Sequence, residues 1–272
     1  MELEITVGPD RFAVVIDDPA ELGIPLDFAG DQARAFYLEP ARAVAVEAEG
    51  FVGDRRRGGS ANCETLTVTP HGNGTHTECV GHITMDRHYL VDIETPPLLP
   101  AVLITVTAAN LSSTDDTYRG NSSPDDEVIC EEALQRALDA LEPLDRRFTT
   151  AVVLRLSNRS PVLRDHSGTN PVYLTDQASR WLRDRGCDHL LVELPSVDRE
   201  DDGGGLSSHH TFFGATPDEP PDGAARSRTI TEMIAVPRSA SDGPYALALQ
   251  VPRLHTDAAP TRPVLYALRR LP

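Results

Sequence analysis

One short segment concentrates side chains that can bind a metal ion or move protons. The stretch from His71 to His82 reads His-Gly-Asn-Gly-Thr-His-Thr-Glu-Cys-Val-Gly-His and holds three of the nine histidines. In an extended backbone, alternate side chains share a face, which would bring His76, Glu78 and His82 together. Two imidazoles and a carboxylate are a good ligand set for zinc or manganese, and a further imidazole could transfer protons. A single histidine would more simply hydrogen-bond its neighbours, but the cluster favours a metal site.

Two later segments offer further ligands. His209 and His210 follow an acidic, glycine-rich stretch, and Glu232 lies in a strand-like run of otherwise small or apolar residues. A carboxylate buried in such a run is costly unless it is paired or binds a cation. Glu232 could equally lie on the exposed face of a half-buried strand, and the histidine pair alone favours neither interpretation. The residues leave both alternatives open.

Charge and composition exclude several functions. The net charge of −17 disfavours binding to nucleic acid and to anionic membrane surfaces, because both require basic patches. All 25 basic residues are arginine, so chemistry that needs a lysine amine, such as a Schiff base or a P-loop, is excluded. We therefore expect a small-molecule partner.

The cysteines and the apolar segments indicate a location. Cys63, Cys79, Cys130 and Cys187 form no C-x-x-C pair, which favours free thiols in a reducing compartment. Cys79 has the opposite parity to His76, so we expect it to pack rather than to bind metal. No apolar segment reaches the length of a transmembrane helix. The prediction is a cytoplasmic protein without a membrane partner.

Strand-like patterns dominate the rest of the chain and predict a mixed, β-rich α/β fold. Two segments predict amphipathic helices, 127–141 and 175–185, the second with Thr175 and Asp176 as cap candidates and Gly186 as its stop. Linkers and repeats are not evident, so we expect a single domain over residues 1–272. The predicted strands are 2–7, 11–16, 43–48, 64–69, 101–107, 151–156, 189–194, 229–236, 245–251 and 263–268.

The segment from His71 to His82 resembles a known signature. It is similar to the H-x-G-T-H-x-D-x-P-x-H motif of the cyclase family of metal-dependent hydrolases, to which kynurenine formamidase and isatin hydrolase belong. The resemblance continues in order over most of the chain from about residue 20. The further matching segments are 24–28 (IPLDF), 173–187 (YLTDQASRWLRDRGC), 194–198 (LPSVD), 208–210 (SHH) and 230–232 (ITE).

The resemblance implies a binuclear metal centre in a swivelling β/α/β-type domain that assembles into dimers or tetramers. One zinc or manganese ion would be held by His71, His76 and Glu78, and a second by Glu78, His209 and Glu232. His82 matches the family's catalytic histidine and would act as the acid and base while a metal-activated water attacks a carbonyl. Asp198 would be a turn residue or would support a ligand.

Three departures from the family pattern bear on function. Glu78 stands where the family has aspartate, which extends the carboxylate by one methylene. The interval from His71 to His76 is one residue longer, and Val80 replaces a proline. The family's W-P-G element is absent, although Phe28, Phe36 and Tyr37 could supply aromatic contacts.

The leading prediction is a metal-dependent hydrolase of a small amide, lactam or lactone, similar to an arylformamidase and acting on carbon–nitrogen bonds other than peptide bonds. The replacement of aspartate by Glu78 motivates an alternative, a metal-binding but non-catalytic member with a scaffold or sensor role. Retention of His82 argues for the enzyme, because a site that has lost catalysis has no reason to keep its proton carrier. A serine hydrolase is disfavoured because no G-x-S-x-G motif occurs.

Overall fold

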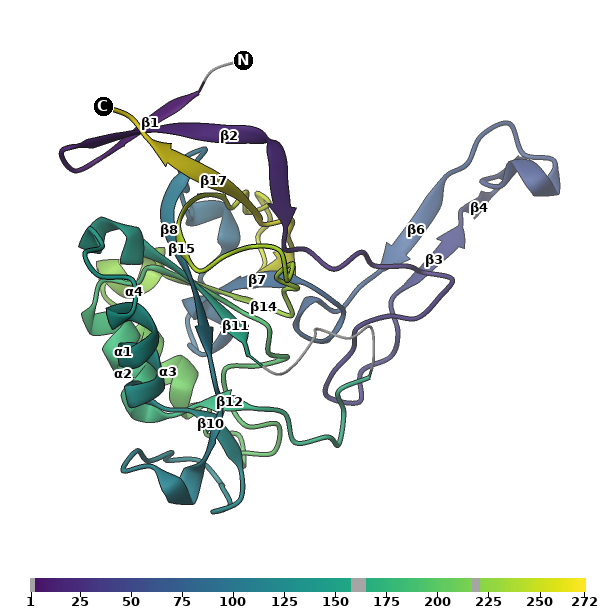
Figure 1. The fold of residues 1–272 in the computed structure, drawn as a ribbon. Helices are drawn as coiled ribbons and strands as arrows, with labels where there is room; N and C mark the ends of the chain where they lie inside the picture. The colour runs from purple at the N-terminus through teal and green to yellow at the C-terminus, as the bar shows by residue number, and fades with distance from the viewer. Residues whose placement is uncertain (1–2, 158–164, 217–220) are drawn as a thin grey trace.

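A ten-stranded mixed sheet forms the centre of the molecule in the computed structural model, which describes residues 3–157, 165–216 and 221–272 (Figure 1). The strands in sheet order are β1 (Glu4–Val7), β2 (Asp10–Glu21), β17 (Val264–Arg270), β15 (Gly243–Ala248), β8 (Leu99–Val106), β11 (Ala151–Leu156), β13 (His189–Val192), β14 (Thr229–Glu232), β7 (His76–Cys79) and β16 (Ala258–Pro260).

The four strands β8, β11, β13 and β14 are parallel neighbours, and all other pairs in this sheet are antiparallel. Parallel neighbours need crossover connections, and here the chain passes through helices between them. Figure 1 shows these helices together on one side of the sheet. They are α1 (Glu131–Asp139), α2 (Asp176–Asp184), α3 (Ser207–Phe213) and α4 (Gly223–Ser227). The predicted mixed, strand-rich α/β fold is confirmed.

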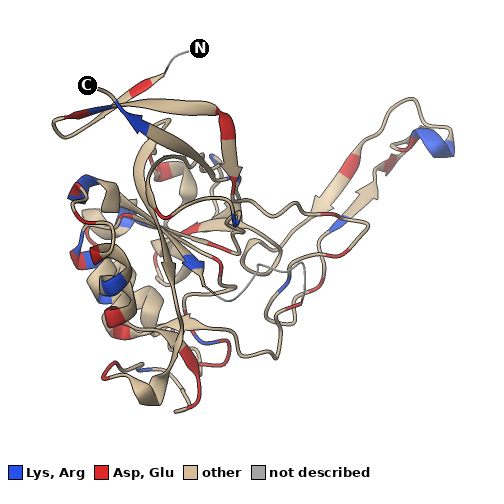
Figure 2. Ribbon diagram, in the orientation of Figure 1, with Lys and Arg blue, Asp and Glu red and all other residues tan. Residues whose placement is uncertain are grey.

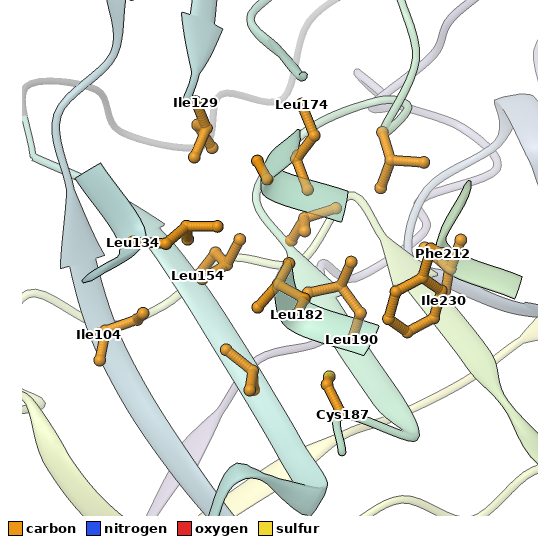
Figure 3. Close-up of a cluster of buried hydrophobic side chains, with 14 of the residues drawn as sticks. Ile104, Ile129, Leu134, Leu154, Leu174, Leu182, Cys187, Leu190, Phe212 and Ile230 are labelled. Carbon is orange, nitrogen blue, oxygen red and sulfur yellow. The ribbon is translucent and has the colours of Figure 1, made fainter. Parts of the chain in front are cut away.

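The main core lies between the parallel strands and the helices (Figure 3). All six residues of β11 are buried, as expected for a strand covered on both faces. Leu154 packs in the cluster that includes Leu182 of α2, whereas Val153 belongs to a second cluster that includes Leu247 of β15. Because alternate residues point to opposite faces, the sheet separates two apolar layers.

Several element boundaries differ from the sequence predictions. The segment predicted as a helix from residue 127 begins with a strand, β10 (Glu127–Ile129), because β-branched Val128 and Ile129 favour strand pairing, and α1 starts only at Glu131. The predicted cap of α2 is confirmed, since the Thr175 side chain accepts a hydrogen bond from Ala178 N. Helices α3 and α4 were not predicted. β10 joins a small sheet with β9 (Ala109–Asn110) and β12 (Tyr173–Leu174).

A two-stranded projection interrupts the chain before β7. It comprises residues 42–69, and it extends away from the rest of the molecule (Figure 1). Its elements are β3 (Arg42–Ala45), β4 (Glu47–Ala48), β5 (Phe51–Val52), the 3-10 helix η1 (Arg55–Arg57) and β6 (Glu64–Thr67). The other 3-10 helices are η2 (Pro70–Gly72), η3 (Val80–His82), η4 (Leu90–Asp92), η5 (Leu111–Ser113) and η6 (Arg146–Thr150).

Within the described ranges, no helix is both long and apolar enough to cross a bilayer. The extent of the single domain over residues 1–272 stays a prediction.

Candidate metal centre

Strands β7 and β14 place three predicted ligands on one face of the sheet. The antiparallel register sets Glu232 opposite His76 and Ile230 opposite Glu78, so the alternate positions of both strands share that face. His76 Nε2 lies 3.4 Å from Glu232 Oε2, and all three functional side chains are buried. Glu232 ends β14, so the site lies at the carboxyl end of the parallel strands, where α/β sheets commonly bind ligands.

Helix α3 brings His209 to the carboxylates of Glu78 and Glu232. The Nε2 atom of His209 lies 2.7 Å from Glu78 Oε1 and 3.8 Å from Glu232 Oε1. The other ring nitrogen, Nδ1, lies 2.5 Å from Asp198 Oδ2, and Asp198 also accepts hydrogen bonds from the backbone N–H groups of Ser208 and His209. Asp198 therefore holds both the ring and the start of the helix. His210 points elsewhere, since its Nδ1 donates to Ala215 O at 2.9 Å.

The tautomers of His76 and His209 are set by their outer partners. His76 Nδ1 lies 3.0 Å from the carbonyl oxygen of Gly74, which can only accept, so this nitrogen carries the proton. His209 Nδ1 donates in the same way to Asp198. Both rings consequently direct Nε2, the nitrogen left for a metal ion, toward the carboxylates of Glu78 and Glu232, as is usual for metal-binding imidazoles. Gly74 adopts φ +75°, a left-handed conformation that glycine allows without strain.

His71 lies on a 3-10 turn, η2, before β7. Despite the longer interval to His76, its Nδ1 atom is 3.0 Å from Glu78 Oε2. The turn is fixed by a hydrogen bond from Thr69 N to the Asn73 side chain, at 2.8 Å. The turn therefore accommodates the one residue by which the interval from His71 to His76 exceeds the family's. His71, His76 and Glu78 offer ligand atoms within 4.8 Å of one another.

His82 reaches the cluster by a route other than the predicted one. Parity predicted an extended backbone through residue 82, but β7 ends at Cys79 and residues 80–82 form the 3-10 helix η3. That local prediction is wrong. The chain turns after Cys79 and packs closely against the backbone of His88, and only glycine fits at position 81, because a side chain there would clash with the His88 carbonyl oxygen. The His82 ring nevertheless stacks on the His71 ring with centroids 4.1 Å apart. Glu78, His82 and His209 offer ligand atoms within 4.8 Å of one another.

Asp257 is a site residue that the sequence analysis missed. Its Oδ2 atom lies 2.8 Å from His71 Nε2 and 3.6 Å from His82 Nδ1. It immediately precedes β16, whose pairing with β7 sets Ala258 opposite Glu78. No motif surrounds Asp257, and only the long-range pairing of these strands brings it to the site.

The seven side chains form two groups that differ in burial. The inner cluster comprises His76, Glu78, His209 and Glu232, whose side chains are at most 3% exposed. The outer cluster comprises His71, His82 and Asp257, with side-chain exposures of 24%, 26% and 41%. Solvent thus reaches the site from the side of the outer cluster.

The charged groups shift one another's pKa values. Burial alone would raise the pKa of Glu78, but the adjacent His82 and His209 outweigh it and hold that pKa well below its usual range. Burial would lower the pKa of His71, but hydrogen bonds with Asp257 and Glu78 raise it to about 10. Carboxylates outweigh burial at His209 as well, and its pKa lies well above the usual range. The inner carboxylates therefore demand positive charge close by, from protons or from a cation.

The buried polar atoms of the inner cluster show that a cation suits it. His76 Nε2, His209 Nε2 and both carboxylate oxygens of Glu78 are buried, and in the described part of the chain their only near polar neighbours are other histidines and carboxylates of the two clusters, such as His209 Nε2 at 2.7 Å from Glu78 Oε1 and His71 Nδ1 at 3.0 Å from Glu78 Oε2. Each of these contacts is a hydrogen bond only if a proton lies between the two atoms, and a buried polar atom left without proton or cation costs about 1–3 kcal/mol. Imidazole nitrogens and carboxylate oxygens facing one another are the donor set of divalent transition-metal sites. The residues present therefore fit a metal ion.

Cys79 lies outside both clusters, as predicted from its parity. It is buried and packs with Leu90 and Ala259. Its thiol lies 3.5 Å from the carbonyl oxygen of His88, and burial raises its pKa to about 12. Cys63, Cys79, Cys130 and Cys187 are all free thiols.

The fold is shared with proteins described as metal-dependent hydrolases. A predicted metal-dependent hydrolase from Bacillus stearothermophilus superposes with a TM-score of 0.55 at 16% identity, covering 92% of this chain and 98% of that one. Isatin hydrolase A from Labrenzia aggregata, bound to benzyl benzoate, gives 0.58 at 14% identity, covering 92% and 93%. An isatin hydrolase bound to the product analogue thioisatinate gives 0.60 at 11% identity, covering 93% of each chain.

A family model agrees with this class. The Cyclase model, described as "Putative cyclase", matches residues 5–199. The chain belongs to the cyclase family. The match contains residues 71–82 and Asp198, while His209 and Glu232 lie beyond it and join the cluster through the structure. No curated protein matches the sequence.

Proposed function

We propose that this protein is a metal-dependent hydrolase that cleaves a small amide, lactam or lactone by attack of water on its carbonyl. The observation that carries the proposal is the inner cluster, in which buried imidazole nitrogens and carboxylate oxygens face one another. The outer cluster beside it supplies half-exposed groups able to exchange protons.

In this proposal the inner cluster and His71 hold two divalent ions, zinc or manganese. His71, His76 and Glu78 bind one ion, and Glu78, His209 and Glu232 bind the other. Glu232 is oriented by a hydrogen bond that its Oε1 accepts from Val197 N at 2.8 Å. Ions bound there would supply a water of lowered pKa and polarise the substrate carbonyl.

The proton transfers fall to the outer cluster. His82 would accept a proton from the attacking water and return it to the leaving nitrogen or oxygen. Asp257, 3.6 Å from His82 Nδ1, would orient the ring. This pairing gives His82 a defined orientation although it lies on a short turn.

The Phe36–Tyr37 segment is a candidate substrate wall. Both residues hold positive φ angles, 60° and 57°, which are rare for aromatic residues and often mark functional segments. The segment joins the site directly, because Ala35 N donates to the carbonyl of Gly72 at 3.2 Å. Phe36 also lines a pocket with Ser196 and Asp198, and a second, open pocket with Tyr37 and Arg199. An aromatic wall favours a flat substrate such as an N-formyl aromatic amine or a fused lactam.

The test is hydrolysis of a matched panel by metal-loaded enzyme: an N-formyl aromatic amine, an aryl-fused lactam and an aryl-fused lactone. We expect turnover of at least one compound, lost on chelation and restored by zinc or manganese. His82→Ala protein with full metal content is the control for contaminating activity. Metal-loaded wild-type protein that turns over no compound faster than this control would contradict the proposed reaction and favour a scaffold or sensor role.

A further inference from the structure

Two buried tyrosines near the metal centre share one environment. Tyr118 and Tyr173 belong to a small apolar cluster with Val128, and their rings meet edge to face with centroids 4.8 Å apart. Tyr118 is 7% exposed and Tyr173 is fully buried. Acidic residues gather in the loops next to β10 and β12 (Figure 2). Both hydroxyl groups find carboxylate partners there, as buried hydroxyls must find partners of some kind.

The two hydroxyl groups are bound to different carboxylates. Tyr173 donates to Asp126 Oδ2 at 2.9 Å. Within the described ranges, Asp126 is not a hydrogen-bond partner of any residue of the inner or outer cluster. The Tyr118 hydroxyl oxygen lies 2.7 Å from Asp198 Oδ1 and 3.0 Å from Asp202 Oδ2. Tyr118 alone of the two tyrosines therefore contacts a carboxylate that supports the inner cluster.

Tyr118 has one hydroxyl proton for two buried carboxylates. A phenol donates a single hydrogen bond, and the shorter distance assigns that bond to Asp198. Burial and the carboxylates of Asp198 and Asp202 raise the pKa of Tyr118 well above its usual range, so the hydroxyl keeps its proton. The hydroxyl thus lies between two acidic side chains, both within 3.0 Å of its oxygen, and separates them.

The same two carboxylates hold the chain where helix α3 begins. Asp202 accepts hydrogen bonds from the backbone N–H groups of residues 204–206, at 2.6–3.1 Å. Asp198 accepts hydrogen bonds from the N–H groups of Ser208 and His209 and from the His209 ring. Tyr118 consequently connects the acceptors of the loop before α3 with those of its first turn. The orientation of the His209 ring depends on this connection.

We infer that Tyr118 is a positioning residue of the metal centre, which acts through Asp198 to keep His209 Nε2 aimed at the inner carboxylates. Without the hydroxyl, Asp198 and Asp202 would face each other with no donor between them, and buried like charges at such a distance repel. Asp198 would be displaced, and its hold on the His209 ring would weaken. The inference rests on the proposed binding of ions by the inner cluster.

Tyr118→Phe and Tyr173→Phe form a matched pair of variants. Each removes one buried hydroxyl and keeps the ring, so the aromatic contact remains and both variants should lose a similar amount of stability. Only Tyr118→Phe should weaken zinc binding, by about threefold to tenfold, which is less than the roughly 10–100-fold usual for a direct partner of a ligand. Competition with a chelator measures the zinc affinity, and thermal melts measure the stability.

Cobalt in place of zinc gives a readout that a loss of stability alone would not change. The visible absorption of bound cobalt depends on the arrangement of its ligands, so a tilted His209 ring should alter the spectrum. Tyr118→Phe should change the position or intensity of these bands. Tyr173→Phe should reproduce the spectrum of the wild-type protein.

A double-mutant cycle with Asp198→Asn tests the route from Tyr118 to His209. Once residue 198 carries no charge, Tyr118→Phe should cost no further zinc affinity, and an equal further fall would overturn the route through Asp198. Zinc affinity in Tyr118→Phe that matches or exceeds that of Tyr173→Phe would overturn the inference and leave the metal centre intact. Wild-type protein that binds no zinc would overturn both the inference and the proposed function.

Discussion

The inner and outer clusters of the candidate metal centre use similar side chains in opposite settings. The inner cluster is carried by two neighbouring strands, β7 and β14, and by helix α3, and it is almost inaccessible, with Glu78 and His76 at 0% exposure. The outer cluster lies on two 3-10 turns and a strand edge, and about a quarter or more of each side chain is exposed. Burial strengthens charge interactions and fixes geometry, whereas exposure permits proton exchange. The comparison supports the proposal that the inner cluster, together with His71, binds ions and that His82 of the outer cluster transfers protons.

The largest effect is expected at the centre of the inner cluster. Glu78→Ala removes the carboxylate shared by both proposed ion sites, so we expect loss of both ions and of all measurable activity. The fold should remain, because Asp198 and Asp257 still pair with His209 and His71 after the change. Elemental analysis and circular dichroism measure the two outcomes, with the exposed Glu94→Ala as the matched control. Two retained ions would refute the bridging role of Glu78.

In the outer cluster, His82→Ala should separate catalysis from ion binding. We expect full metal content and a fall in kcat of about 10²–10⁴-fold, the usual contribution of a general acid or base. His255→Ala, an exposed histidine outside both clusters, is the control. An undiminished rate would make His82 a bystander, and loss of metal would move it into the inner cluster.

Asp198→Asn probes the support of the inner cluster. The carboxylate that fixes the His209 tautomer becomes an amide, which can turn its NH₂ group toward Nδ1. We expect metal affinity to fall by about 10–100-fold, as is usual for such outer partners, and excess metal to restore activity. Titration with a competing chelator gives the affinity. Unchanged affinity would show that His209 needs no such support.

Asp257→Asn is the corresponding change in the outer cluster. The amide leaves His82 less firmly oriented, so we expect kcat to fall by about tenfold, by analogy with other partners of this kind, with metal content unchanged. Asp92→Asn, at an exposed position of η4, is the control. A fall in metal content would place Asp257 among the ligands through its contact with His71.

The smallest effect is expected at a buried carboxylate remote from both clusters, Asp126. Burial raises its pKa, but hydrogen bonds from Arg199, Ser123 N, Asn170 and Tyr173 outweigh burial and hold it below the usual 3.8. Since the folded-state pKa is lowered, this stabilisation is complete above the usual pKa and is lost as the pH falls through the folded value. Asp126→Asn should therefore cost about 1–3 kcal/mol at neutral pH.

Thermal melts across pH check this prediction for Asp126. The difference from wild type should shrink below about pH 4 while metal content stays unchanged. The exposed Asp125→Asn should show neither effect. A pH-independent difference would mean that Asp126 acts through packing rather than charge, and a loss of metal would mean that the clusters extend further than their contacts show.

The sequence predicted the parts of the site that are encoded locally. The strand predicted at residues 229–236 contains β14, and the parity of an extended backbone correctly placed His76 with Glu78 on one face of β7. His209 and Glu232 could be assigned only through the resemblance to the cyclase family, because their own surroundings carry no distinctive spacing.

The remaining features depend on contacts between distant segments. Asp257 reaches His71 through the pairing of β16 with β7, which joins positions about 180 residues apart and leaves no local pattern. Helix α3 has seven residues and follows Leu206 at φ 43°, so tertiary contacts rather than helix propensity hold it in place. The turn at residues 80–82 likewise replaces a strand that local alternation favoured. Local pattern thus found His76 and Glu78 of the inner cluster, and it misread the backbone that brings His82 to the outer one.

The most direct test of this account is the metal content of wild-type protein purified without chelator or affinity metal. The inner cluster predicts close to two equivalents of zinc or manganese per chain, measured by elemental analysis. A chain that holds no metal, even after reconstitution with either ion, would contradict the metal centre and leave the chain with the family's fold alone.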